Sequence, residues 1–186
     1  MDSIWTAETQ IEKRDPLPGD TGTAAVVIGA GLAGILTAYY LGQEGIPAVV
    51  LEADRIGSGQ TKNTTAKITS QHGLIYDRLI RTFGRRMGEQ YARANEAAIR
   101  EYERLIREKG IDCDFVRCPA CLYSCREEDA LRREARAASS LGIAASFESS
   151  GELPFPVAGL TRFEGQARFQ PLQFLGRMAE EVTVVE

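Results

Sequence analysis

Three glycines at fixed spacing are the first residues of the sequence whose types and positions suggest chemistry. They lie in the sequence GAGLAG at residues 29–34, directly after an apolar run at residues 24–28. In a dinucleotide-binding turn, Gly29 would permit the tight turn, Gly31 would admit the pyrophosphate and Gly34 would let the helix approach the sheet. The amides and dipole of the following helix would then face the phosphates.

A carboxylate completes this pattern. Glu52 follows Gly34 by eighteen residues and ends a second apolar run at residues 48–51. A carboxylate in that position accepts hydrogen bonds from the ribose hydroxyls of the adenosine. It would also repel a 2′-phosphate, so NADP is not expected.

The elements that must position these residues follow from the local sequence. Residues 24–28 are typical of a strand buried on both faces, and residues 32–44 of a helix. Gly45 is a suitable residue to end that helix, and Pro47 prevents its continuation. The sequence therefore predicts a βαβ unit that binds a dinucleotide.

The segment after Glu52 bears on which dinucleotide is bound. Residues 57–65 are rich in Gly, Ser, Thr and Asn, and no third apolar strand follows directly, as it usually would in an NAD domain. Small residues allow close backbone approach and offer donors, which suits the diphosphate and the flavin edge of FAD. The alternative is a plain surface loop of turn-forming residues.

Beyond these motifs the sequence resembles a known family. The segments VVIGAGLAG at 26–34, EADR at 52–55 and GQTKNTTAKITSQHG at 59–73 resemble the D-amino-acid-oxidase-type FAD-dependent oxidoreductases. The sequence is most similar to the bacterial branch that often carries a C-terminal Rieske [2Fe–2S] domain. Residues 3–5, 111–115 and 166–171 extend the resemblance over essentially the whole chain.

The resemblance implies FAD as the cofactor and oxidation of an amine or amino-acid C–N bond by hydride transfer to flavin N5. It also implies a small-molecule amine or amino-acid substrate. The candidate cofactor-binding residues are Gly29, Ala30, Gly31, Ala33, Gly34, Glu52, Ala53, Gly59, Thr61, Asn63, Thr65 and Ala66.

Members of this family are longer than this chain, and later strands complete their FAD-binding domain and their substrate sheet. The chain also lacks a Cys-x-His pair for a Rieske cluster. A second hypothesis is therefore a non-catalytic truncated or split module that needs a partner chain. The possible protein partners are a redox partner or the missing C-terminal half. A third, weaker hypothesis is an NAD-dependent dehydrogenase.

Two further sets of residues have chemical potential. His72, the only histidine, is a weak catalytic candidate, and a structural histidine is the favoured interpretation. The four cysteines are spaced Cys-x4-Cys-x2-Cys-x3-Cys, of which the first three match plant-type ferredoxins. The fourth lies too close for that pattern, so packing or incidental thiols are favoured and no metal site is predicted.

Composition limits the remaining possibilities. The chain has 186 residues, 44% hydrophobic and 26% charged, with a net charge of −4 and a pI near 5.3. This composition is ordinary for a globular protein and does not favour nucleic-acid binding. The uncharged run at residues 24–41 is long enough to suggest a membrane helix, but its glycines and strand-like start argue against one. No secretory signal is visible, and a cytoplasmic location is expected.

The whole chain is predicted to be α/β, with an incomplete Rossmann-like FAD-binding βαβ domain, long helices and a small β-containing portion of a substrate domain. Further helices are expected at 74–109, broken near Gly84 and Gly88, at 127–141 and at 171–180, and short strands within 111–124 and at 160–163, 167–169 and 182–185. The predicted domain ranges are an N-terminal arm at 1–22, the FAD-binding domain at 23–112, a partial substrate or cap region at 113–170, and a returning helix and strand at 171–186.

Overall fold

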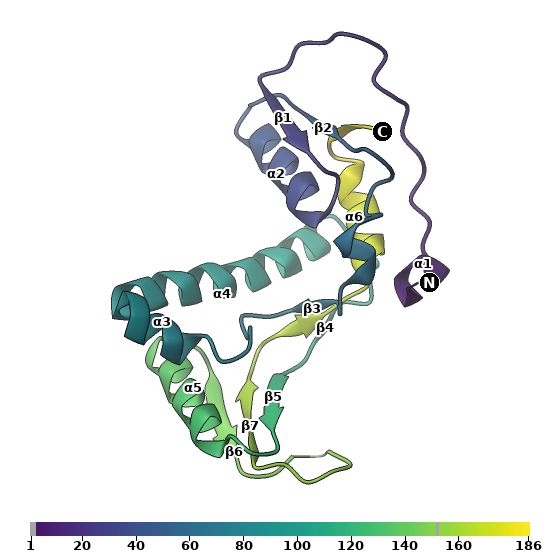
Figure 1. Ribbon diagram of the computed structural model, residues 1–186. Coiled ribbons are helices and arrows are strands. Elements are labelled where there is room, and N and C mark those ends of the chain that lie inside the picture. The colour runs from purple at the N-terminus through teal and green to yellow at the C-terminus, as the bar shows by residue number, and fades with distance from the viewer. Residues whose placement is uncertain (1–2, 152) are drawn as a thin grey trace. The chain divides into compact units, whose positions relative to one another are not determined.

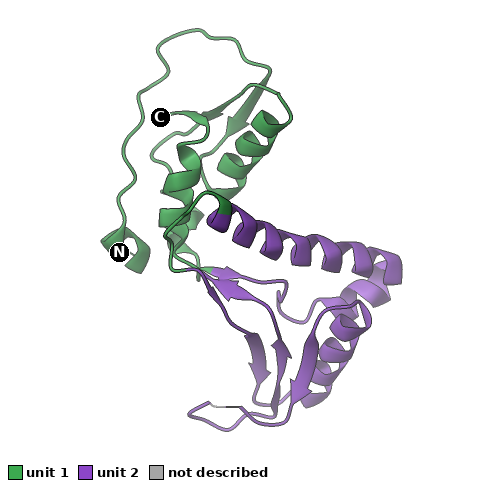
Figure 2. Cartoon of the chain, turned by 180° about the vertical axis from the view of Figure 1, so that it is seen from behind, with its two compact units in different colours: residues 1–66, 108–114, 169–186 green, residues 67–107, 115–168 purple. Residues whose placement is uncertain are grey.

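The computed structural model describes residues 3–151 and 153–186, which form two compact units (Figure 2). The first unit comprises residues 1–66, 108–114 and 169–186, and the second comprises residues 67–107 and 115–168. Residues 67–107 therefore belong to the second compact unit, whereas the predicted FAD-binding domain at 23–112 includes them. The predicted domain ranges stay a prediction.

The first unit is built on a parallel sheet with the strand order β1-β2-β9. The strands are β1 (Ala25–Ile28), β2 (Ala48–Leu51) and β9 (Thr183–Val185), and helix α2 (Leu32–Gln43) connects the first two. The predicted βαβ unit and the predicted return of the chain as a C-terminal strand are both present. The α/β class predicted from the sequence is confirmed.

The two faces of this sheet differ. Val27, Val50 and Val184 share one register and therefore one face, and Val50 is fully buried there beneath α2. Val26 and Ile28 of β1 point to the other face, where their exposed fractions are 55% and 87%. The prediction that the strand at 24–28 is buried on both faces is therefore wrong for this chain.

The described part of the N-terminal arm includes the short helix α1 (Ile4–Glu8), which was not predicted. Ser3 caps α1, because its hydroxyl accepts a hydrogen bond from the backbone N–H of Thr6 (3.4 Å). The C-terminal helix α6 (Pro171–Ala179) begins at the predicted proline and is capped by the side chain of Gln170.

The second unit contains two helices, α3 (Tyr76–Phe83) and α4 (Arg85–Glu108, whose last residue belongs to the first unit). The chain breaks between them at Gly84, which has a φ of +80°. The second break, predicted at Gly88, is wrong. Gly88 lies inside α4, where an added Cβ would be 3.2 Å from Ile80 and 3.3 Å from Leu141. Gly88 therefore serves close packing.

Two antiparallel sheets complete the second unit (Figure 1). The smaller has the order β3-β8-β4, formed by β3 (Lys67–Ile68), β8 (Ala167–Arg168) and β4 (Val116–Arg117). The larger has the order β5-β7-β6, formed by β5 (Ala120–Ser124), β7 (Gly159–Phe163) and β6 (Ala145–Glu148). Strands β3 and β6 were not predicted.

Helix α5 (Glu128–Ser140) packs against the larger sheet and against α3. Leu131, Ala135 and Ala138 are buried on the face of α5 that packs against these elements. At the centre of the core lies Tyr76, fully buried and stacked on Phe163, with a ring-centroid distance of 6.1 Å. None of the helices formed by the described residues is long and apolar enough to cross a membrane.

Candidate dinucleotide site

The glycine turn joins β1 to α2 in the geometry that the sequence predicts. Gly29 has a φ of +98°, and its N–H donates to the carbonyl of Leu51 (2.7 Å). A Cβ at Gly34 would lie 1.9 Å from the carbonyl oxygen of Gly29, which no side chain can tolerate. Gly34 is therefore needed for the close approach of α2 to the turn.

The N-terminus of α2 has the properties of an anion-binding site. Its cap residue is Gly31, which provides no side-chain hydrogen bond, and the first turn contains no acidic residue. The N–H of Leu32 donates to the hydroxyl of Thr61 (3.3 Å). Because Gly31 lacks a side chain and the helix dipole is uncompensated there, a diphosphate could approach the turn closely.

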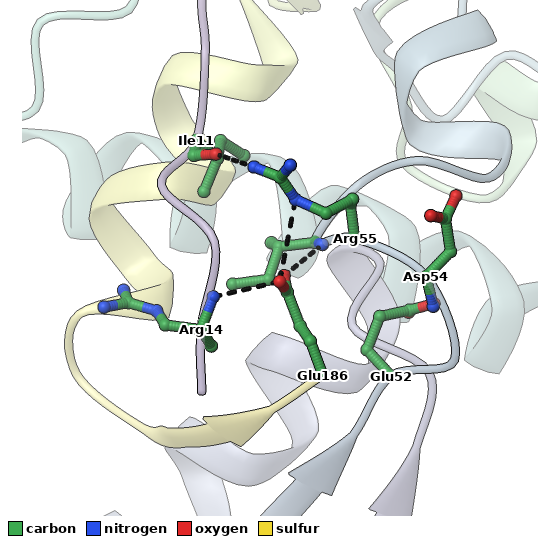
Figure 3. A network of polar contacts seen from close by, with 7 residues as sticks. Ile11, Arg14, Glu52, Asp54, Arg55 and Glu186 are labelled. Atoms are coloured by element: carbon green, nitrogen blue, oxygen red, sulfur yellow. Dashed lines mark hydrogen bonds and ion pairs between the residues drawn. The ribbon is translucent and has the colours of Figure 1, made fainter. Parts of the chain in front are cut away.

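Glu52 lies next to the glycine turn. One carboxylate oxygen accepts a hydrogen bond from the backbone N–H of Ala30 (2.7 Å), and the other accepts one from Asp54 (3.1 Å), as Figure 3 shows for the second contact. Glu52 is half-buried and the neighbouring Ala53 is exposed. The carboxylate is thus held where the second strand ends.

The small-residue segment at 57–66 follows β2 by five residues and contacts the glycine turn and the start of α2. The N–H of Gly57 donates to the carbonyl of Ala30 (3.0 Å), and η1 (Gln60–Asn63) buries the side chain of Thr61. Ala66 has a φ of +58°, a left-handed conformation uncommon outside glycine. This segment is therefore an ordered element in contact with the turn, unlike a plain surface loop.

All twelve candidate cofactor-binding residues lie in the first unit. The structure joins the glycine turn, Glu52 and Thr61 through the hydrogen bonds above. Three other candidates, Gly59, Asn63 and Thr65, are exposed along the segment, where the side-chain amide of Asn63 donates to the carbonyl of Gly59 (3.2 Å).

His72 belongs to the second unit and is exposed. Its Nε2 lies 3.2 Å from Oδ1 of Asn95, whose amide nitrogen donates to the carbonyl of Tyr91 (2.9 Å). A catalytic role for His72 stays a prediction.

A buried polar cluster fixes the segment that precedes His72. The hydroxyl of Ser70 donates to the carboxylate of Glu96 (2.6 Å), and its backbone N–H donates to the side-chain oxygen of Gln166 (2.7 Å). The hydroxyl of Tyr76 donates to the carbonyl of Ser70 (2.7 Å), and burial raises the pKa of Tyr76. The run TSQHG at residues 69–73 is therefore held from three sides.

The cysteines do not form a cluster. Cys113 is buried in the first unit, whereas Cys118, Cys121 and Cys125 belong to the second, where the last two are exposed. All four are free thiols, and burial raises the pKa of Cys121. Among the described residues, no three side chains of His, Cys, Asp or Glu are grouped so that they could hold a metal ion.

Sequence reasoning missed Glu186, whose side chain is 1% exposed. One carboxylate oxygen accepts a hydrogen bond from the N–H of Ile56 (2.9 Å), and the other accepts one from the N–H of Arg14 (2.9 Å) and lies 3.6 Å from Nε of Arg55 (Figure 3). Glu186 thereby fastens both the arm and the segment after β2 to the third strand. Its position at the end of an apolar run was the only signal in the sequence.

This glycine turn, open helix start and acidic strand end define a dinucleotide-binding βαβ unit. Comparison with known families gives its particular class. The family described as FAD dependent oxidoreductase (DAO) matches residues 24–183, so the chain belongs to this family, whose cofactor is FAD. The resemblance inferred from the motifs is confirmed.

The chain is also similar to individual proteins, one by sequence and two by fold. The chain is 34% identical over 185 residues to the "Putative Rieske 2Fe-2S iron-sulfur protein YhfW" of Bacillus subtilis (strain 168), covering 97% of this chain and 36% of that protein. It also has the fold of two solved structures. L-amino acid deaminase from Proteus vulgaris has a TM-score of 0.67 at 17% identity, with 94% of this chain and 42% of that chain covered. Glycine oxidase from Geobacillus kaustophilus has a TM-score of 0.64 at 18% identity, with 88% and 46% covered.

The chain therefore spans less than half the length of each of these three proteins. The alignment with the Bacillus protein includes nearly all of this chain, and so includes both the glycine turn and the segment behind Glu52.

Proposed function

We propose that the first unit binds the ADP half of FAD and serves as the cofactor-binding portion of an FAD-dependent oxidoreductase. The observation that carries this proposal is the start of α2, where the cap residue Gly31 has no side chain to cover the helix amides and the first turn contains no acidic residue. A diphosphate is the ligand that such a helix start favours. Membership of the FAD dependent oxidoreductase family supports FAD as the dinucleotide.

Most of the candidate residues have a physical role in this proposal. Gly29 makes the turn, and Gly31 and the backbone of Ala33 meet the diphosphate. Glu52 would accept hydrogen bonds from the ribose hydroxyls, and its contact with the N–H of Ala30 beside the glycine turn supports this role. Thr61 contacts the start of α2 and can offer its hydroxyl to the diphosphate.

The remaining candidates serve the flavin end. Gly59, Asn63 and Thr65 are exposed on either side of Thr61 and Ala66 ends the segment, and their small side chains would allow close approach. When bound, FAD would supply a hydride acceptor for oxidation of a C–N bond. The contribution of these residues is to hold the cofactor and to leave room beside it.

The substrate class rests on the solved neighbours. Two of them are named for activity on amino acids, an L-amino acid deaminase and a glycine oxidase. We infer a small-molecule amine or amino acid as the substrate of the longer enzyme to which this chain corresponds. A redox partner is supported by the relative whose name includes a Rieske 2Fe-2S iron–sulfur protein.

A titration of the purified chain with FAD tests the binding proposal. We expect one FAD per chain, displaced by ADP and not by FMN, because FMN lacks the ADP half. Glu52→Gln should weaken FAD binding about tenfold, the effect of losing one charge-assisted hydrogen bond. A chain that binds no FAD, or that releases it equally to FMN, would contradict the proposal. Tight binding of NAD would favour a dehydrogenase.

A second candidate is a non-catalytic module that requires a partner chain. Its support is the sheet face formed by Val26 and Ile28, which is exposed on β1 at one edge of the sheet. Exposed apolar side chains on an edge strand favour association. Light scattering coupled to size-exclusion chromatography separates the two candidates, because a monomer with a cooperative thermal transition would argue against a partner requirement.

A further inference from the structure

The N-terminal arm contacts the segment that the proposed function assigns to FAD. Residues 3–15 meet this segment and its neighbours at several separate points. The indole N–H of Trp5 donates to the backbone carbonyl of Thr64 (2.9 Å), and the guanidinium of Arg55 donates to the carbonyl of Ile11 (2.9 Å). The arm is therefore bound across the segment, although it is far from it in sequence.

Gln170 also binds the arm, through hydrogen bonds to Trp5 and Thr9. Its side-chain oxygen accepts hydrogen bonds from the first N–H groups of α6, those of Leu172 (2.7 Å) and Gln173 (3.1 Å). Its amide nitrogen donates to the carbonyl of Trp5 (3.3 Å) and to the hydroxyl of Thr9 (2.7 Å). Gln170 is 1% exposed, so these bonds are shielded from water. The position of Trp5 is thereby set by the start of α6.

The carbonyl that Trp5 binds, that of Thr64, lies two residues before the left-handed residue Ala66. Thr64 follows η1, and its hydroxyl accepts a hydrogen bond from the N–H of Ala66 (3.3 Å). Ala66 is in the left-handed region, and its carbonyl accepts a hydrogen bond from the N–H of Phe169 (3.3 Å). A non-glycine residue persists there only when its surroundings hold it. The bond from Trp5 holds the backbone two residues before Ala66.

We propose that Trp5 is a positioning residue for FAD, which orders residues 61–66 through its hydrogen bond to Thr64 before the cofactor arrives. This inference rests on the proposed function, because residues 61–66 include four of the candidate cofactor contacts. A segment held in its binding conformation loses less conformational freedom when the ligand binds, which strengthens binding. The arm thus contributes to affinity through the segment.

The test compares the 186-residue chain with Trp5→Phe, which keeps an aromatic ring and deletes the N–H donor. In the absence of FAD, amide hydrogen exchange at residues 61–66 should become about threefold to tenfold faster, the range for loss of one hydrogen bond. The FAD dissociation constant should rise by a similar factor of about three to ten. A general loss of stability would instead accelerate exchange across the whole unit, including β2.

Two further variants make the outcome decisive. Leu17→Ala changes an apolar residue of the same arm that is 45% exposed, and it should leave both measurements unchanged. Thr9→Val removes the hydroxyl bound by Gln170 without altering Trp5, and it should shift both measurements in the same direction as Trp5→Phe by a smaller factor.

The results distinguish failure of the inference from failure of the proposed function. If the unaltered chain binds FAD and Trp5→Phe binds it equally well with unchanged exchange at residues 61–66, the role of Trp5 is refuted and the proposed function stands. If the unaltered chain binds no FAD, the proposed function fails and the inference fails with it.

Discussion

Substituting alanine for either of two glycines in α2 should change stability in opposite directions. An added Cβ at Gly34 would lie 1.9 Å from the carbonyl oxygen of Gly29, which is 1.5 Å closer than the 3.4 Å at which ordinary contact begins. The obstructing atom belongs to the backbone of the turn, so no side-chain rotation relieves the clash. Gly42, near the end of the same helix, has no such neighbour within 4 Å.

The magnitudes follow from packing and helix propensity. Overpacking of a tight site costs about 1–3 kcal/mol, and a clash with backbone belongs near the upper end of that range. Alanine gains up to about 1 kcal/mol over glycine inside a helix, which offsets part of the cost in Gly34→Ala. We therefore expect Gly34→Ala to lower the free energy of unfolding by about 2 kcal/mol and Gly42→Ala to raise it by about 0.5 kcal/mol.

Urea unfolding followed by circular dichroism measures both changes, and the FAD titration measures the consequence at the site. Because Gly34→Ala must move the start of α2 away from the turn, it should also weaken FAD binding more than about tenfold under conditions where the variant is folded. Gly42→Ala should bind FAD as the unaltered chain does. If Gly34→Ala unfolds within about 0.5 kcal/mol of the unaltered protein, the close approach of α2 to the turn is not as described.

Two other predictions concern carboxylates away from the glycine turn. The carboxylate of Glu134 is fully buried and accepts hydrogen bonds from three backbone N–H groups at the start of α3 (2.8–3.0 Å), so Glu134→Gln should lower the free energy of unfolding in urea by about 1–3 kcal/mol. The control Glu128→Gln changes a half-exposed residue of α5, the helix that also carries Glu134, and should cost less than about 0.5 kcal/mol. Equal costs for the two variants would refute the role of Glu134. A hydrogen bond between Lys109 and Glu181 (2.9 Å) lowers the pKa of Glu181 and raises the pKa of Lys109. The pair therefore stabilises the fold between the ordinary pKa of Glu181 and that of Lys109. Because the pair is partly exposed, Glu181→Gln should lower the free energy of unfolding by at most about 1 kcal/mol at neutral pH. This difference should vanish as the pH falls through the lowered pKa of Glu181, and a difference that persists in acid would contradict the role of the pair.

The βαβ unit could be predicted from the sequence because its signals are local. The glycines and the apolar runs act through backbone geometry within a few residues of themselves, and the strands, the turn and the helix lie where the sequence predicts them. The helix ends at Gly84 and at Pro171 were predicted on the same basis. Helix ends can be predicted from the sequence where the conformational limits of a single glycine or proline decide where the helix begins or ends.

The features that were missed depend on distant partners. Gly88 has the sequence signal of a helix break, but packing against Leu141 keeps it inside α4. The role of Glu134 arises only when α5 meets the start of α3, and that of Glu186 only when the third strand meets the arm. No spacing along the chain connects these residues. The short strand β6 likewise exists through its pairing with β7.

The candidate site residues also fall into those with local sequence signals and those without. The residues of the glycine turn could be proposed from spacing alone, whereas the segment at 57–66 required the family resemblance. The proposed contribution of Trp5 could not be predicted, because the resemblance of residues 3–5 to the family assigns Trp5 no contact. Its partner, the carbonyl of Thr64, is 59 residues away in sequence.

The central claim is that the glycine turn and Glu52 hold the ADP half of the cofactor. Titration of ADP into 15N-labelled protein, followed by the backbone amide resonances, tests it most directly. We expect saturable shifts that are largest at residues 31–34 and near Glu52, with the second unit unaffected. If ADP leaves these amides unchanged while FAD binds elsewhere, or if neither ligand perturbs them, the assignment of this site is contradicted.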